Sequence, residues 1–292
     1  MIKSVFVKIK GDCEQGFSAE LRSGKKGEAS TKVIEGSFPP SSELPQKQQN
    51  WQSNYRKYGG MGSSTRTLKA KKAQVTHVSL DDSAEELGFS VNDWLNSAHP
   101  QYRRFRDKLV GELQGEGKIS LVIQTDDLTL WRLPWQLWDV LEDNKVEVSI
   151  CPCEYEKAET VPITKPKNRV RILVIIGDSR GINTKKDLKL LEEELPSAEI
   201  QPLIHPTKEQ LSSKLWEQEW DILFFAGHSS SEDENFQGFF KINETESLTI
   251  KELKDALNNA IKYGLKLAIF NSCDGLGLAR ELASLQIPAT VD

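Results

Sequence analysis

From about residue 170 onward, short apolar segments alternate regularly with amphipathic ones, and this alternation leaves few folds open. The segments 170–176, 221–226 and 265–270 are almost continuously apolar, which is typical of strands buried on both faces of a parallel sheet. The segments between them have helical spacing of their apolar residues. This pattern predicts an α/β fold whose parallel sheet is covered by helices on both faces. The expected elements are strands at 170–176, 200–204, 221–226 and 265–270 and helices at 185–195, 209–216, 249–261 and 276–285.

The preceding 165 residues have a different character. Alternating apolar residues in the first 35 positions predict a small antiparallel unit of paired strands with glycine-rich turns. Pro134 can open a helix that carries Trp135 and Trp138 into the core. We divide the chain into a β-rich unit and linker over residues 1–72, an α/β part over 73–165, and the parallel-sheet part over 166–292. Within the first two parts we expect helices at 46–58, 82–96 and 102–113, a linker at 59–64, and strands at 73–80 and 119–124.

Composition and charge exclude several classes of function. The chain has 292 residues, 38 Lys+Arg against 43 Asp+Glu, and 38% apolar residues, as soluble globular proteins do. No apolar run approaches the roughly 20 residues of a membrane-spanning helix, and the first ten residues alternate instead of forming a signal peptide. We expect a cytoplasmic protein without a membrane segment. Residues 1–75 carry 14 Lys and Arg against 6 Asp and Glu, but aromatics are not interleaved with them, so we expect no nucleic acid partner.

Cofactor and metal sites are not indicated either. The four cysteines, at 13, 151, 153 and 273, are too scattered for a disulfide framework, and we expect free thiols. One residue separates Cys151 from Cys153, fewer than a zinc site usually has, and His77, His99 and His205 are dispersed. The segment 177–181 lacks the Gly-Lys-Ser/Thr of a phosphate-binding loop. We therefore expect no metal and no cofactor.

Reactive side chains follow two of the expected strands. Strand 221–226 runs into Gly227-His228, and strand 265–270 runs into Asn271-Ser272-Cys273. Chemistry in parallel sheets takes place beyond the carboxyl ends of the strands, so adjacent strands would bring His228 and Cys273 together. A nearby base and the N-terminus of the following helix both lower the pKa of a thiol. The residues alone leave two hypotheses open: a Cys-His catalytic pair, or a buried structural cysteine and a hydrogen-bonding histidine.

Three motifs then support the first hypothesis. Leu133-Pro-Trp-Gln-Leu-Trp138, the segment 221–230 and the segment 267–279 together resemble, in the right order, the motifs of CHAT domains, a bacterial family related to caspases and separase. The resemblance covers roughly residues 80–292. It implies a caspase-like three-layer sandwich, Cys273 as nucleophile, His228 as general base, and hydrolysis of peptide bonds in a protein substrate. It also implies a place in a bacterial signalling protein, where a regulatory protein is a further partner.

The chain departs from the family pattern in several places. Caspase-like peptidases generally have Gly after the histidine, whereas here Ser229 follows it and Gly227 precedes it; we assign Gly227, Ser229 and Asp274 to support of the oxyanion. Relatives of the metacaspase type carry an acid two places before the cysteine, where this chain has Asn271. Selectivity for Arg or Lys is therefore not expected. Asp178 and Asn271 are selectivity candidates, as are Asp274 and the acidic run 232–234. Family members also continue beyond residue 291, so we expect a fragment or a shortened form.

Two alternatives remain for the function. A serine hydrolase of the esterase type is disfavoured, because residues 227–231 fail the fifth position of the Gly-x-Ser-x-Gly motif and no histidine follows His228. The other alternative is a non-catalytic caspase-like module that binds a protein partner. Reactivity of Cys273 separates that module from a peptidase, since a scaffold has no reason to hold a thiolate at neutral pH.

Overall fold

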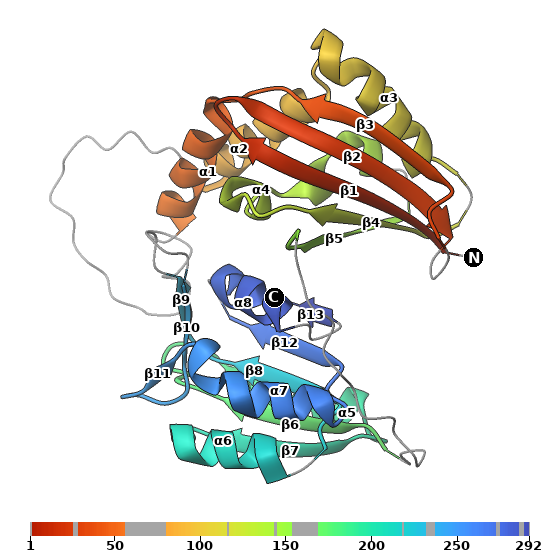
Figure 1. Ribbon diagram of the computed structural model, residues 1–292. Coiled ribbons are helices and arrows are strands. Elements are labelled where there is room, and N and C mark those ends of the chain that lie inside the picture. Colours follow the sequence, from red (N-terminus) through yellow and green to blue (C-terminus); the bar gives the residue numbers. More distant parts are fainter. Residues whose placement is uncertain are drawn as a thin grey trace, which may run out of the picture. The chain divides into compact units, whose positions relative to one another are not determined.

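The computed structural model describes residues 2–25, 29–55, 80–115, 117–142, 145–153, 169–217, 219–231, 237–272, 275–285 and 289–291. The chain divides into two compact units, Met1–Cys153 (unit 1) and Glu154–Asp292 (unit 2), whose elements are labelled in Figure 1. Both expected boundaries, after residues 72 and 165, lie outside the described residues and stay predictions.

Unit 1 is built on one five-stranded mixed sheet with the order β3-β2-β1-β4-β5. The first three strands pair antiparallel, as predicted from their alternating residues. β4 then joins β1 in parallel, and β5 joins β4 in parallel, so segments on both sides of residues 56–79 share one sheet. The strands are β1 (Lys3–Asp12), β2 (Gly16–Lys25), β3 (Lys32–Phe38), β4 (Ile119–Gln124) and β5 (Val146–Cys151).

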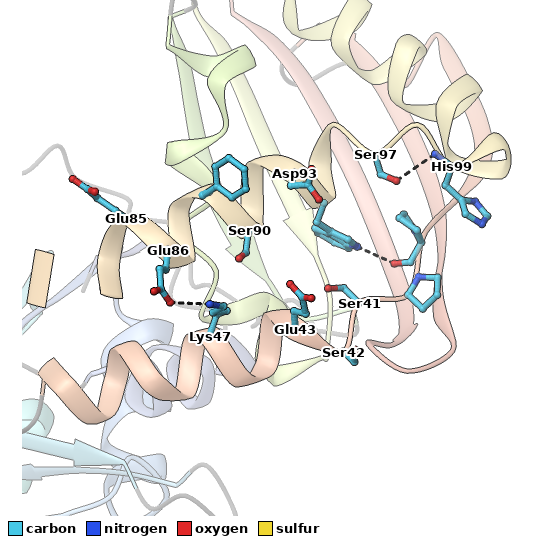
Figure 2. Close-up of a pocket in the computed structure, with 14 residues that line it drawn as sticks. Ser41, Ser42, Glu43, Lys47, Glu85, Glu86, Ser90, Asp93, Ser97 and His99 are labelled. Carbon is cyan, nitrogen blue, oxygen red and sulfur yellow. Dashed lines mark hydrogen bonds and ion pairs between the residues drawn. The ribbon is translucent and has the colours of Figure 1, made fainter. Parts of the chain in front are cut away.

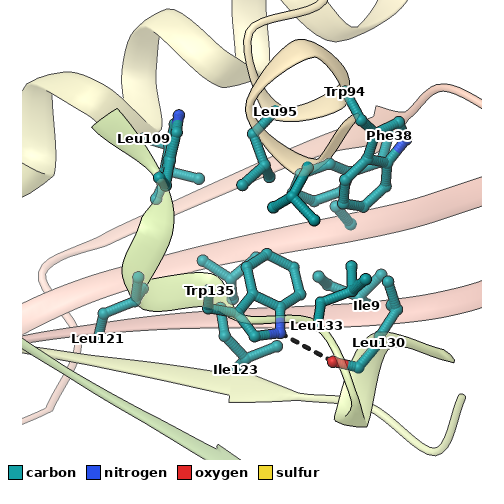
Figure 3. Close-up of a cluster of buried hydrophobic side chains, with 14 of the residues drawn as sticks. Ile9, Phe38, Trp94, Leu95, Leu109, Leu121, Ile123, Leu130, Leu133 and Trp135 are labelled. Carbon is teal, nitrogen blue, oxygen red and sulfur yellow. Dashed lines mark hydrogen bonds between the residues drawn. The ribbon is translucent and has the colours of Figure 1, made fainter. Parts of the chain in front are cut away.

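The helices of unit 1 cover the apolar face of this sheet. Figure 3 shows the core, in which Trp94 and Leu95 of one helix and Leu109 of another meet side chains of the sheet. The expected strand at 73–80 lies outside the described residues except for Leu80, which begins a helix. The helices are α1 (Glu43–Asn54), α2 (Leu80–Leu95), α3 (Pro100–Leu113) and α4 (Leu128–Trp131), with the short 3-10 turns η2 (Trp135–Leu137) and η3 (Asp139–Leu141).

The tryptophan-rich segment after α4 is buried as predicted, but it is not a helix. Trp135 and Trp138 are 3% and 1% exposed. Pro134 precedes a single 3-10 turn, η2. The Trp135 indole N–H donates to the Leu130 carbonyl at 2.8 Å. This hydrogen bond and the two buried indole rings hold the segment in place. The segment is therefore part of the core although it does not form an α-helix.

An ion cluster ties the C-terminal turn of α3 to the sheet. The Glu112 carboxylate lies 2.8 Å from Lys3 Nζ of β1 and 2.6 Å from Lys32 Nζ of β3. Partial burial raises the pKa of Glu112, but hydrogen bonds from the two lysines outweigh that effect and lower the pKa to about 2. The depressed value means that the ionised carboxylate stabilises the folded unit.

We expect Glu112→Gln to lower the free energy of unfolding by about 2 kcal/mol at pH 7. The carboxylate's contribution is present above the ordinary pKa of 4.5 and is lost as the pH falls toward about 2, so the variant and the parent should converge in acid. Urea unfolding at pH 7 and pH 3 measures both effects. Glu147→Gln is the control, because Glu147 pairs with Lys118 at 3.5 Å and is 74% exposed, so it should cost little. Equal losses in the two variants would contradict the prediction.

Unit 2 contains the predicted parallel sheet. Its order is β13-β12-β8-β6-β7, and all four neighbouring pairs are parallel. The strands are β6 (Arg171–Ile176), β7 (Glu199–Ile204), β8 (Ile222–Ala226), β12 (Leu267–Asn271) and β13 (Ala289–Val291).

Helices pack on both faces of the parallel sheet and give the three layers that the apolar strands predicted. On one face, Leu173 and Phe225 join a cluster with residues of three helices; on the other, Val174 and Phe224 pack against Leu188 and its neighbours. The first face carries α6 (Lys208–Glu217), the turn η4 (Lys251–Leu253), α7 (Lys254–Lys262) and α8 (Leu276–Ser284), and the second carries α5 (Thr184–Glu194).

Side-chain capping hydrogen bonds stabilise the first turn of two of these helical segments. Thr207 Oγ1 accepts from the Gln210 N–H, and the Gln210 side chain accepts from the Thr207 N–H, so the two residues form a reciprocal capping box. Thr249 and Glu252 form the same arrangement. The helix expected from residue 249 therefore begins with the turn η4 before α7.

A second, antiparallel sheet follows His228 and was not predicted. It consists of β9 (Ser229–Ser231), β10 (Gly238–Lys241) and β11 (Ser247–Leu248), in the order β11-β10-β9.

In the described parts of the chain, no helix has both the length and the apolar character required to cross a bilayer.

Candidate active site

Three central strands of unit 2 end level with one another. Ala226 of β8 lies opposite Asn271 of β12 on one side and opposite Ile176 of β6 on the other. In the sequence, His228 is two residues beyond the end of β8, and Asp178 and Cys273 are two residues beyond the aligned positions of β6 and β12. The register therefore places the ends of the three strands at one edge of the sheet, where Asp178 and His228 follow β6 and β8.

Backbone and side-chain hydrogen bonds hold His228. Its N–H donates to the Asp178 carbonyl at 3.1 Å, and its carbonyl accepts from the Lys241 N–H at 2.9 Å. The half-buried imidazole places Nε2 2.7 Å from the carbonyl oxygen of Arg180. Because a carbonyl oxygen only accepts, Nε2 carries the proton, and in the neutral ring Nδ1 holds the basic lone pair.

Two glycines let the ends of β6 and β8 pack tightly below the histidine. A Cβ atom on Gly177 would lie 2.1 Å from the Lys241 carbonyl oxygen, and one on Gly227 would lie 2.8 Å from the Phe225 ring. The Asp178 N–H donates to that same Lys241 oxygen at 2.9 Å. The backbone of Lys241 therefore bridges the two strand ends and contributes to the position of His228.

Asp178 and Arg180 form a planar ion pair beside the histidine. Arg180 Nε lies 3.0 Å from Oδ1 of Asp178, and Nη2 lies 2.8 Å from Oδ2. The Asp178 side chain is 2% exposed and the Arg180 side chain 62%. Hydrogen bonds from Arg180, together with its positive charge, lower the pKa of Asp178 to about 2. The carboxylate is thus ionised and faces Arg180, and the cation faces solvent.

The other predicted site residues lie near the same strand ends or outside the described residues. The Gly227 N–H is directed at the Asn271 carbonyl, 3.5 Å away, so the oxyanion assignment of Gly227 stays a prediction. Ser229 is half-buried in β9, and Asn271 is exposed at the end of β12. Cys273, Asp274 and the acidic run 232–234 lie outside the described residues.

The first turn of α8 packs closely against β10. A Cβ atom on Gly238 would lie 2.3 Å from the Leu278 nitrogen, and one on Gly277 would lie 2.9 Å from the Gly238 nitrogen. This contact needs glycine on both sides and fixes where α8 begins, one residue after Gly275. Cys273 precedes that start by three positions.

The three described cysteines have protonated thiols at neutral pH. Burial is the main cause and raises the pKa of Cys13 to about 11, and it also raises the pKa values of Cys151 and Cys153. All three are free, as expected. Since thiolates are the reactive form, an alkylating reagent should leave these three cysteines largely unmodified at pH 7.

A groove of about 830 Å³ lies in unit 1 between α1 and α2. Figure 2 shows Glu43 and Lys47 on α1 facing Glu86 and Ser90 on α2, with the Lys47–Glu86 ion pair across the gap. The groove contains none of the predicted catalytic residues. Its Ser97–His99 hydrogen bond uses the backbone N–H of the histidine and not the ring. Among the described residues, no group of three His, Cys, Asp or Glu side chains is arranged to hold a metal.

Two participants of the site were not predicted from the sequence. They are the carbonyl oxygen of Arg180, which contacts the imidazole, and the backbone of Lys241 in β10. Both are main-chain groups. For the Arg180 carbonyl, the one signal in the sequence is that the segment 177–181 directly follows an apolar strand.

Comparison with known proteins identifies the family of the chain. The family model of the CHAT domain matches residues 95–286, close to the range over which the motifs resemble the family. A search of curated proteins finds no match. The match covers more than half of the 292 residues, and the chain therefore belongs to the CHAT domain family, which is related to the caspase-like peptidases.

Proposed function

We propose that unit 2 is a cysteine peptidase in which Cys273 is the nucleophile and His228 the general base. The observation that carries the proposal is the register of β8 and β12, which aligns Ala226 with Asn271. Each reactive residue follows its strand end by two positions. Family membership supports the same pair, since the matched range includes both motifs.

In the proposed reaction, Nδ1 of His228 takes the proton from the Cys273 thiol. The thiolate adds to the carbonyl carbon of a peptide bond, and the tetrahedral intermediate collapses to a thioester as the C–N bond breaks. The departing amine takes the proton from Nδ1, and water then hydrolyses the thioester and regenerates the thiol. The Arg180 carbonyl supports this role, because it holds the proton of the neutral ring on Nε2.

The start of α8 supports the thiolate electrostatically. α8 begins at Leu276, three positions after Cys273, and a helix N-terminus carries partial positive charge. A helix start and a neighbouring histidine both lower the pKa of a thiol. The buried thiols of unit 1 have raised pKa values instead, so Cys273 should differ sharply from them.

We expect Cys273 to react with iodoacetamide with an apparent pKa well below the ordinary value of about 8.5. His228→Ala should slow this reaction at pH 7 at least about tenfold, because the base that accepts the thiol proton is removed. Alkylation rates from pH 5 to 10, read by mass spectrometry of the Cys273 peptide, measure both effects.

The control for that experiment is His99→Ala, which removes an exposed histidine of unit 1 and should leave the alkylation of Cys273 unchanged. A Cys273 that titrates near 8.5 with or without His228 would overturn the peptidase proposal. The non-catalytic module that binds a protein partner would then be the better account. Cleavage of a denatured protein substrate by the parent, abolished in Cys273→Ala, tests the hydrolysis itself.

The biological setting is proposed on the family resemblance alone. We infer that the chain belongs to a bacterial signalling protein that acts on a protein substrate and is controlled by a regulatory partner. If the Cys273→Ala variant recovers its substrate protein intact, and recovers no fragments of that substrate, the result would support a proteolytic role.

A further inference from the structure

We propose that the groove between α1 and α2 of unit 1 binds a basic peptide segment of a partner protein. One Lys or Arg side chain of that segment lies over the Phe89 ring, between the carboxylates of Glu85 and Asp93. The groove contains none of the proposed catalytic residues, so this inference does not depend on the peptidase proposal.

Three of the lining residues form one row along α2. Phe89 lies four positions after Glu85 and four before Asp93, and residues at this spacing are neighbours on the surface of a helix. All three side chains are exposed. At 75%, Phe89 has the largest exposed fraction of the large apolar side chains in the described parts of the chain. An accessible aromatic ring with a carboxylate on each side attracts a cation through the ring face and through both charges.

The groove carries an excess of acidic side chains. One lining residue is a lysine, and four are acidic, namely Glu43, Glu85, Glu86 and Asp93. Lys47 pairs with Glu86 at 2.8 Å, and within the described residues no ion pair engages the other three carboxylates. α2 itself contributes five acidic residues and no basic one. The groove therefore complements a cationic occupant and disfavours a nucleic acid or an acidic peptide.

The shape of the surface fits a peptide better than a small cation. The groove has a volume of about 830 Å³, and a depression of about 270 Å³ adjoins it, with Pro39, Pro40 and His99 lining both. Ser18 and Ser37 are among the uncharged polar residues that line the second depression. A single cation would need only the row on α2. A surface with an acidic part and a neutral polar part fits an extended segment whose basic residues lie toward one end.

Part of the groove is fixed before a partner binds. Trp94 is 4% exposed, and its indole N–H donates to the Pro39 carbonyl at 2.8 Å. Its ring stacks on Phe38 at 5.1 Å. The Lys47–Glu86 ion pair links α1 to α2 across the gap (Figure 2). A preformed surface lowers the ordering cost of binding.

Fluorescence anisotropy of labelled peptides mixed with the full chain tests the inference. The probe is a Gly-Ser peptide with several lysines, and the matched controls carry glutamine or glutamate at the lysine positions. We expect the lysine peptide to bind at least about tenfold more tightly than the glutamine peptide, and the glutamate peptide to bind most weakly. The preference should shrink in 1 M salt, because salt screens exposed charges.

Variants of the α2 row separate the contribution of the ring from that of the charges. Glu85→Gln combined with Asp93→Asn should weaken binding of the lysine peptide at least about fivefold. Phe89→Leu keeps an apolar side chain but removes the aromatic face, so it should weaken binding at least about threefold. Phe89→Tyr keeps that face and should retain the affinity.

The control variants change equally exposed residues of unit 1 outside the groove. Glu147→Gln combined with Asp107→Asn removes two exposed acids, and Val33→Ala truncates an apolar side chain that is 60% exposed. Both should leave the affinity unchanged. Circular dichroism and melting temperatures establish that the variants are folded.

Three outcomes would overturn the inference. The first is equal affinity for the lysine and glutamine peptides, or an affinity that the α2 variants leave unchanged. The second is a dimer of the parent chain in sedimentation equilibrium that Phe89→Ala dissociates, because a second copy would then cover the groove. The third is binding of the probe only after the six Lys and Arg of residues 56–79 are replaced by Gln, since the groove would then bind the chain's own basic residues.

Discussion

Gly177→Ala is expected to destabilise unit 2 by at least about 3 kcal/mol and to displace the backbone that holds His228. The added Cβ would lie 2.1 Å from the Lys241 carbonyl oxygen and 2.8 Å from the Phe225 ring. That oxygen belongs to the backbone of β10 and accepts from the Asp178 N–H, so it cannot turn away as a flexible side chain would. β10 must move, and the bond from the Lys241 N–H to His228 moves with it.

Urea unfolding and the alkylation rate of Cys273 measure the two consequences. We expect a lower unfolding midpoint for unit 2 and a loss of the His228-dependent reactivity by at least about tenfold. Gly111→Ala is the control, because a Cβ atom there meets nothing within 4 Å and alanine in a helix is favoured by roughly 0.5–1 kcal/mol. If Gly177→Ala kept both the midpoint and the reactivity, Lys241 would not be part of the support for His228.

The parallel sheet of unit 2 could be predicted because its strands carry their own signal. The segments 221–226 and 265–270 are apolar except for Asp221 and Lys266, and such nearly continuous apolar character is typical of a strand covered on both faces. Once two such strands are neighbours, the topology places the residues after each strand at one edge of the sheet. The prediction that the residues after 226 and 270 share that edge depended on the strands alone and not on the loops.

The surroundings of His228 could not be predicted in the same way. β9 is Ser-Ser-Ser and β11 has two residues, too short for an alternating pattern. The contact to the imidazole comes from the carbonyl of Arg180, and every residue has a carbonyl, so the sequence carries no mark of it. The charge of Arg180 was visible, but its pairing with a buried Asp178 depends on the loop geometry.

Unit 1 shows a similar limit. Alternating residues predicted the antiparallel pairing of β1 with β2, which are neighbours in the chain. The parallel pairing of β1 with β4 joins Lys3 to Ile119, and no local pattern specifies a partner so distant in sequence. The start of α1 at Glu43 also differs from the expected 46, because its mostly polar sequence gives a weak helical period.

The contact between β3 and α3 in unit 1 depends on a missing side chain. A Cβ atom on Gly36 would lie 2.3 Å from Cδ2 and 2.5 Å from Cβ of Phe105. Phe105 is 1% exposed, and its ring packs edge-on against Phe38 at 5.6 Å. Phe38 in turn stacks on Trp94 at 5.1 Å. Because its neighbours are packed at interior density, Phe105 has little room to rotate away.

We therefore expect Gly36→Ala to lower the free energy of unfolding of unit 1 by about 3 kcal/mol, since α3 must shift away from β3. Urea unfolding followed by tryptophan fluorescence measures the loss. In a Phe105→Leu background the same substitution should cost less, because the smaller side chain relieves the collision. Gly111→Ala, in α3 itself, should be neutral or stabilising. Alkylation of Cys273 should be unchanged, since unit 2 has its own core. Equal costs in both backgrounds would show that Phe105 does not set the requirement for glycine.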